Sequence, residues 1–204
     1  MDNEKSLKEV EKVLTKGSKF TIKSIEEFNK SIDHVIQLIM DSYTLYKIKS
    51  FSTSVFISIA VIEEVGKIHM GIYINNVVET KKDSLRDHKT KEIIGSNYTI
   101  CMGERLQKAI GKEKIEEIYR LSYDGTLKDL REKALYCDRE EDDFVTPSEC
   151  ISEDFSKNIL LFAIESFDDN LVGYSEYSIG KSKSMDEIFI EISKKDKKSV
   201  NLNL

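Results

Sequence analysis

Apolar residues recur at intervals of three and four residues along most of the chain, which is the spacing of one face of an α-helix. One such stripe consists of Ile25, Phe28, Ile32, Val35, Ile36, Ile39, Met40 and Tyr43. Just before it, Ser24 is followed three residues later by Glu27, which is the capping-box pattern of a helix start. The pattern therefore predicts a helix from about Ile25 to Lys47.

A second apolar stripe begins near Ser50 and ends near Ile74. Its members are Phe51, Val55, Ile59, Ile62, Val65, Ile68 and Ile72. Between Val55 and Ile62 the sequence is apolar almost all the way round the helix, which is typical of a helix enclosed by others. We expect this helix to be the most buried one.

Weaker patterns predict further helices. They cover residues 6–15, 83–94, 100–121 and 127–136. The segment 100–121 is interrupted by Gly103 and Gly111. The sequence Thr146-Pro147-Ser148-Glu149 has a hydroxyl cap, proline at the first position and glutamate at the third, which predicts a helix from there to about Phe167. After Asp168 the periodicity decays.

The composition supports an all-α fold. The 204 residues contain one proline and 9 glycines, fewer than the many turns of a sheet-rich protein would need. Apolar residues make up 40%, which is enough for a packed core. We therefore expect a helical bundle of about five to seven helices over residues 20–170, with an N-terminal extension (1–19) that holds a short helix and a peripheral C-terminal segment and tail (171–204).

Charge and cysteine content narrow the functional classes. The net charge of −6 makes sequence-blind coating of DNA a poor hypothesis. No run approaches the roughly 20 apolar residues of a membrane-spanning helix, and residues 1–8 do not resemble a secretory signal. Three cysteines without a CxxC pair argue against a disulfide framework, so we expect a cytoplasmic protein without membrane contact. No metal-ligand spacing or cofactor fingerprint is present, so we expect neither a metal nor a cofactor.

Charged residues within the most apolar helix are the main anomaly. Glu63, Glu64 and Lys67 lie in this segment, and an unpaired charge there would cost several kcal/mol. Lys67 is at helical spacing from either acid, so pairing is one interpretation and a functional cluster is the other. Gly66 in mid-helix costs about 1 kcal/mol against alanine. We expect it to allow another backbone to approach closely beside the charges.

A second polar cluster spans residues 86–91. His88 and Lys91 share a helix face, with Arg86 to one side. Such a group suits phosphate binding or acid–base chemistry, since histidine titrates near neutrality, but a solvated basic turn has the same sequence. His69 is expected to be a core or edge histidine, His34 is ambiguous, and the acidic run 138–143 is expected to be a solvated loop.

These segments together resemble a known family. The series consists of Ala60-Val61-Ile62-Glu63-Glu64-Val65-Gly66-Lys67, then His88-Lys89-Thr90-Lys91, then Leu135-Tyr136-Cys137-Asp138 before Pro147. In this order and spacing it resembles the AbiV family over roughly residues 20–167. These are bacterial abortive-infection proteins that defend cells against phage, and the family is assigned to the HEPN superfamily of helical domains, many of which are ribonucleases or their inactive relatives.

The resemblance implies a helical bundle, paired into a homodimer, with polar residues gathered in a cleft. The apolar circumference of the helix 50–74 is a further reason to expect a dimer. The candidate binding cluster contains Glu63, Glu64, Lys67, Arg86, His88, Lys91, Tyr136 and Asp138. Implied partners are a phage-encoded protein as trigger and RNA or the translation machinery as target.

One feature departs from the catalytic relatives. Ribonucleases of the HEPN superfamily carry an arginine and, about four to six positions later, a histidine. The arginines here are Arg86, Arg105, Arg120, Arg131 and Arg139, and the histidines are His34, His69 and His88. No pair has that spacing.

Two hypotheses follow. The first is a dimeric effector that arrests phage propagation by binding a phage or host component, for example by blocking translation, with the motif residues forming an interior polar network. The second is a metal-independent ribonuclease with a rearranged site, in which His88 is the base and Lys67 and Lys91 stabilise the phosphate charge. The missing spacing favours the first hypothesis.

Overall fold

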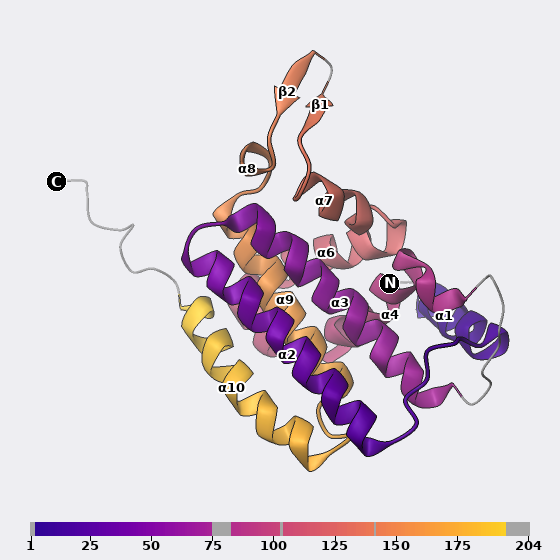
Figure 1. The fold of residues 1–204 in the computed structure, drawn as a ribbon. Helices are drawn as coiled ribbons and strands as arrows, with labels where there is room; N and C mark the ends of the chain where they lie inside the picture. The colour runs from indigo at the N-terminus through magenta and orange to yellow at the C-terminus, as the bar shows by residue number, and fades with distance from the viewer. Residues whose placement is uncertain (1–2, 75–82, 103, 141, 195–204) are drawn as a thin grey trace.

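The computed structural model describes residues 3–74, 83–102, 104–140 and 142–194. Within these ranges the chain forms ten α-helices, one short 3₁₀-helix and one two-stranded hairpin (Figure 1). The longer helices are α1 (Asn3–Lys16), α2 (Ile25–Lys47), α3 (Phe51–Tyr73), α4 (His88–Met102), α6 (Lys112–Asp124), α9 (Glu153–Leu171) and α10 (Glu176–Ser193). The all-α prediction is confirmed, as is the short N-terminal helix.

The central element of the fold is α3. It packs against α2, α4 and α9, and α2, α3 and α9 lie side by side in Figure 1. Its apolar side chains Val55, Ile59 and Ile62 are completely buried. The apolar circumference of this helix is therefore covered by helices of its own chain, and it gives no independent reason to expect a dimer.

The first long helix begins where the capping pattern predicts. Ser24 Oγ accepts a hydrogen bond from the backbone N–H of Glu27 (3.2 Å), and the Glu27 carboxylate accepts one from the backbone N–H of Lys23 (2.8 Å). The first contact satisfies a donor that a helix start leaves unpaired, and the second ties the residue before the cap to the first turn. The predicted bounds of α2 and α3 agree with the structure within one residue.

Short elements raise the helix number above the five to seven expected. They are η1 (Ser84–Arg86), α5 (Glu104–Ile110) and α8 (Pro147–Cys150), whereas α7 (Leu127–Lys133) is the short helix predicted over 127–136. The predicted break at Gly111 is confirmed: this residue has φ of 85° and separates α5 from α6. Gly103, the other predicted break, lies outside the described residues.

The prediction of one helix from Pro147 to about Phe167 is wrong. Pro147 begins only the single turn α8, and Ile151 then has an extended backbone. The long helix α9 starts afresh at Glu153, where Ser152 Oγ accepts a hydrogen bond from the N–H of Phe155 (3.1 Å). A second hydroxyl cap, six residues after the first, therefore divides the segment.

The acidic run is also different from the expected loop. Strands β1 (Asp138–Glu140) and β2 (Asp143–Val145) pair antiparallel, with Arg139 opposite Phe144. In Figure 1 this hairpin projects from the end of the bundle at which α7 and α8 lie. Both strands are exposed along most of their length.

The segment after Asp168 is more ordered than its periodicity predicts. Helix α9 continues to Leu171, and α10 packs along α9 and α2 at the flank of the bundle. The α10 side chains of Met185 and Phe189 are buried against this flank. The expected tail at 195–204 lies outside the described residues. Among the helices in the described ranges, none combines the length and the apolar character that crossing a membrane requires.

Candidate functional site

The site lies where α3 and α4 cross in backbone contact. A Cβ atom placed on Gly66 would lie 2.2 Å from the carbonyl oxygen of Lys91, and one on Gly95 would lie 2.1 Å from a carbonyl oxygen of α3. Neither helix therefore tolerates a side chain at the crossing. The close approach expected from Gly66 is confirmed, and it places Glu63 beside His88 and Lys91.

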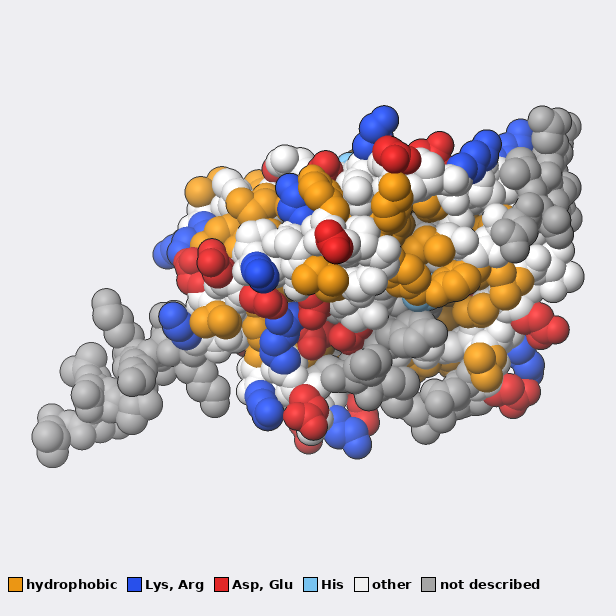
Figure 2. All heavy atoms as spheres, turned by 90° about the horizontal axis from the view of Figure 1, so that it is seen from below, with side chains coloured by type: hydrophobic (Ala, Val, Ile, Leu, Met, Phe, Trp, Pro, Cys, Tyr) orange, Lys and Arg blue, Asp and Glu red, His pale blue; other side chains and the backbone are white. Residues whose placement is uncertain are grey.

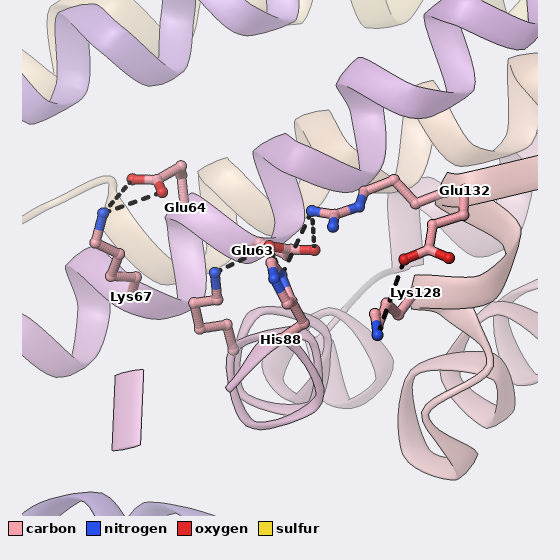
Figure 3. A network of polar contacts seen from close by, with 8 residues as sticks. Glu63, Glu64, Lys67, His88, Lys128 and Glu132 are labelled. Carbon is pink, nitrogen blue, oxygen red and sulfur yellow. Dashed lines mark hydrogen bonds and ion pairs between the residues drawn. The ribbon is translucent and has the colours of Figure 1, made fainter. Parts of the chain in front are cut away.

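The carboxylate of Glu63 is the centre of the site. It is buried, with 4% of the residue exposed, and its Oε2 accepts hydrogen bonds from His88 Nδ1 (2.7 Å) and Lys91 Nζ (3.0 Å). Its Oε1 accepts a hydrogen bond from a guanidinium nitrogen of Arg131 in α7 (3.0 Å). Glu63 and His88 face each other in Figure 3. Charge-assisted bonds of this kind are the strong ones, so this cluster joins α3, α4 and α7.

The hydrogen bond to Glu63 fixes the histidine tautomer. An ionised carboxylate only accepts, so His88 Nδ1 carries the hydrogen and donates it. The Arg131 guanidinium nitrogen that lies 3.4 Å from Nδ1 is therefore a neighbour, not a donor to that atom. The second ring nitrogen, Nε2, has no hydrogen-bond partner in the described part of the chain, and the side chain is 36% exposed. His88 is thus held through Nδ1 by Glu63, and its Nε2 is left without a partner among the described residues on a partly exposed side chain.

A second carboxyl group lies next to the cluster. Glu92 in α4 is completely buried, and neither of its carboxyl oxygens has a hydrogen-bond partner within the described ranges. Burial, reinforced by the negative charge of Glu63, raises the pKa of Glu92 from 4.5 to about 8. Glu92 is therefore mostly protonated at neutral pH, and Glu63 carries the local negative charge.

Sequence reasoning missed Arg131 and Glu92. Along the sequence Arg131 is tested only for the arginine–histidine spacing of HEPN ribonucleases. In the fold it approaches His88 from a different helix, α7. The sequence does contain a signal for such a partner. A buried Glu63 carboxylate needs cations, and Arg131 is an arginine that lies shortly before the motif at residues 135–138. Its side chain is 18% exposed, and its Nε is buried without a partner in the described part of the chain.

Two of the predicted cluster residues form a pair of their own. Lys67 Nζ donates to both carboxylate oxygens of Glu64 at 3.1 Å, and it also lies 4.5 Å from the centre of the Phe20 ring. Figure 3 shows this pair further along α3 from Glu63. Among the described residues, no hydrogen bond joins it to the Glu63 cluster, so the expected single network is two separate groups.

The residues of the third motif lie elsewhere. Tyr136 is 64% exposed, and Asp138 begins strand β1 in the projecting hairpin. Neither makes a hydrogen bond or ion pair with the Glu63 cluster within the described ranges, so the structure does not gather them into one cleft with it. Arg86 is exposed in η1, but with Lys67 and Lys91 it lines a common cavity.

The other two histidines lie outside the cluster, and His69 is the core histidine that the sequence predicts. His69 is buried, with Nδ1 2.9 Å from the carbonyl oxygen of Asn170, and burial lowers its pKa against the opposing effect of that hydrogen bond. His34 is exposed on α2. Neither lies in the cluster, and His88 is the one histidine that does.

A comparison with known protein families agrees with this fold. A family model for HEPN-type domains matches residues 23–167, more than two thirds of the chain, so the class of protein is a HEPN-type helical domain. The model is described as AbiV, and the chain belongs to that family. Membership points to an abortive-infection-type function. No curated protein and no solved structure matches the chain.

Proposed function

We propose that this chain is an antiphage abortive-infection effector that arrests phage propagation by binding a phage or host component, without cutting RNA. Membership of the AbiV family supports the defence role. The mode of action rests on one observation, which is that the carboxylate bound by His88 also holds two cations, Lys91 and Arg131. A ribonuclease directs such cations at the charge that develops on the reacting phosphate.

Their burial supports the same conclusion. The side chains of Lys91 and Arg131 are only 10% and 18% exposed, and each donates to the Glu63 carboxylate. A phosphodiester that approached His88 would have to compete with that carboxylate for both cations. The cluster is therefore better suited to holding α3, α4 and α7 together than to stabilising a substrate.

The proposed effector is a cytoplasmic homodimer that a phage-encoded protein activates and that then blocks translation. With α3 enclosed by its own chain, the dimer rests on the family resemblance and on apolar surface at the end of the bundle where α2 and α10 begin. Ile25, Tyr73 and Tyr174 are 49%, 47% and 41% exposed, and Figure 2, which views the molecule from below, shows hydrophobic side chains among the charged ones on this face. Sedimentation that shows only monomers at micromolar concentration would count against the dimer.

A second candidate function is a HEPN-type ribonuclease that uses His88. The observation in its favour is the Glu63–His88 pair, because a buried carboxylate that fixes the tautomer leaves Nε2 placed to accept a proton from a ribose hydroxyl. Lys91 would have to release Glu63 to reach the phosphate, and Lys67 would have to release Glu64. The RNA itself would be the only reactant besides these side chains.

Incubation with RNA separates the two functions. Purified protein is mixed with total RNA and with tRNA, with and without EDTA, alongside His88→Ala and a control, His34→Ala, that removes an exposed histidine elsewhere. The binding function predicts no cleavage by any of the three proteins. Cleavage by the wild type and by His34→Ala that disappears in His88→Ala would establish the ribonuclease instead.

A further inference from the structure

A cavity of about 510 Å³ has an unusual charge for so acidic a chain. Its lining consists of Lys19, Phe20, Lys67, Asp83, Leu85, Arg86 and Lys91. Among the described residues of the lining, four positive side chains thus face one negative one, although the whole chain has a net charge of −6. The positive residues come from the segment before α2, from α3, from η1 and from α4, so the fold gathers cations that are dispersed along the sequence.

Two of these cations form no direct ion pair with the described residues. The side chains of Lys19 and Arg86 are exposed, and neither forms an ion pair or a side-chain hydrogen bond with the described residues. Lys67 and Lys91 are each held by one glutamate, and an ammonium group has three hydrogens to donate. The cavity therefore offers more donors and more positive charge than the protein itself satisfies.

Asp83, the one carboxylate among the described lining residues, is held by other groups. Asp83 accepts hydrogen bonds from Ser18 Oγ (2.7 Å), from the backbone N–H of Leu85 (3.0 Å) and from the backbone N–H of Lys19 (3.2 Å). Burial opposes its ionisation, but these donors, together with the positive charge of Arg86, hold the pKa of Asp83 below its usual value. Asp83 therefore fixes the segments that carry Lys19 and Arg86, and its oxygens accept their hydrogen bonds from groups other than these two side chains.

We propose that this cavity binds the phosphate groups of a small phosphorylated molecule. Arginine and lysine are the residues that recognise phosphate, and a volume of this size is typical of small-molecule sites. A nucleic acid backbone would instead require a basic stripe that extends along the surface. The cations here converge on one concavity of an acidic protein, which favours a compact polyanion.

The cavity also touches the Glu63 cluster. Lys91 lines the cavity and donates to Glu63 Oε2, the oxygen that also accepts from His88 Nδ1. A bound phosphate would draw on the same lysine and so weaken its hold on Glu63. The inference goes beyond the proposed function, because it names a ligand class and holds whether the effector acts by binding or by cleavage.

Calorimetric titration with pyrophosphate, at low salt and in a phosphate-free buffer, tests the proposal. Arg86→Ala and Lys19→Gln remove the two unpaired cations, and both positions are exposed, so the fold is expected to survive. Arg120→Ala and Lys183→Gln are matched controls, since they remove exposed cations from α6 and α10. We expect saturable binding that weakens about tenfold with each cavity variant, which corresponds to the loss of about one charge-assisted hydrogen bond. The controls are expected to bind as the wild type does.

Three results would overturn the proposal. One is the absence of saturable binding at millimolar pyrophosphate. Another is equal weakening by the cavity variants and the controls, which would indicate general charge attraction. The last is binding of single-stranded RNA that pyrophosphate does not displace, which would make the surface a polymer site. None of these bears on RNA cleavage by His88, so the failure of this inference is distinguishable from the failure of the proposed function.

Discussion

The carboxylate of Glu63 and the imidazole of His88, on two different helices, are joined by a hydrogen bond of 2.7 Å. The relationship exists because Gly66 and Gly95 let α3 and α4 approach to backbone contact. Lys91 and Arg131 complete the shell around the carboxylate. Residues that look catalytic in the sequence therefore form, in the fold, a buried carboxylate surrounded by Lys91, Arg131 and His88.

Removing the central carboxylate should destabilise the protein severely. Glu63→Gln removes the carboxylate to which the largely buried Lys91 and Arg131 donate, and breaking a buried pair in this way costs about 3–5 kcal/mol. We expect the free energy of unfolding in urea to fall by about that amount. Glu64→Gln is the control, because its partly exposed ion pair with Lys67 contributes at most about 1 kcal/mol. Equal losses in the two variants would refute the central role of Glu63.

The helix crossing should not accept alanine. In Gly66→Ala the new methyl group would meet the carbonyl oxygen of Lys91, so α3 and α4 must separate. We expect a loss of about 3 kcal/mol or more in the free energy of unfolding, as for other overpacked sites. Gly180→Ala in α10 is the matched control, since nothing lies within 4 Å of its added methyl group. Gly180→Ala should be neutral or stabilising by up to about 1 kcal/mol. If Gly66→Ala is tolerated equally well, the close approach of α3 and α4 is contradicted.

Glu92 should make the stability depend on pH. Its pKa of about 8 in the folded protein lies above its ordinary value of 4.5, so between these values the folded state holds a proton that the unfolded state has lost. The free energy of unfolding should therefore fall as the pH rises from about 4.5 to 8. Glu92→Gln removes this ionisation.

The measurement is urea unfolding of both proteins at pH 5 and pH 8. The difference in the free energy of unfolding between Glu92→Gln and the wild type should shift in favour of the variant by on the order of 3 kcal/mol from pH 5 to pH 8. The control, Glu113→Gln, removes an exposed carboxyl group of α6 and should track the wild type. If Glu92→Gln also tracks the wild type, the buried carboxyl group titrates normally.

Part of this site could be predicted from the sequence because its signals are local. Gly66 within an apolar helix indicates a close approach, and Glu63 beside it indicates a buried charge that needs partners. Helical spacing alone left open whether Glu63 or Glu64 pairs with Lys67. The structure pairs Lys67 with Glu64 and leaves Glu63 to partners from other helices.

The rest depended on packing between distant segments. Arg131 is 68 positions from Glu63, and only the packing of α7 against α3 brings them together. Glu92 sits next to Lys91 in a polar-looking run, and nothing local shows that its side chain is turned into the core. The start of α9 was misplaced for a different reason: two hydroxyl caps compete within one segment, at Thr146 and Ser152, and the later one begins the long helix.

The most direct test of the central claim is phage plating on cells that express the wild type or His88→Ala. Loss of His88 leaves Lys91 and Arg131 on Glu63, so we expect the variant to fold, with a loss of about 1–2 kcal/mol. Circular dichroism checks the fold. An effector that acts by binding should protect cells as well with His88→Ala as with the wild type. The binding mode of action would be contradicted if the folded variant no longer protects and RNA fragments accumulate only in infected cells that express the wild-type protein.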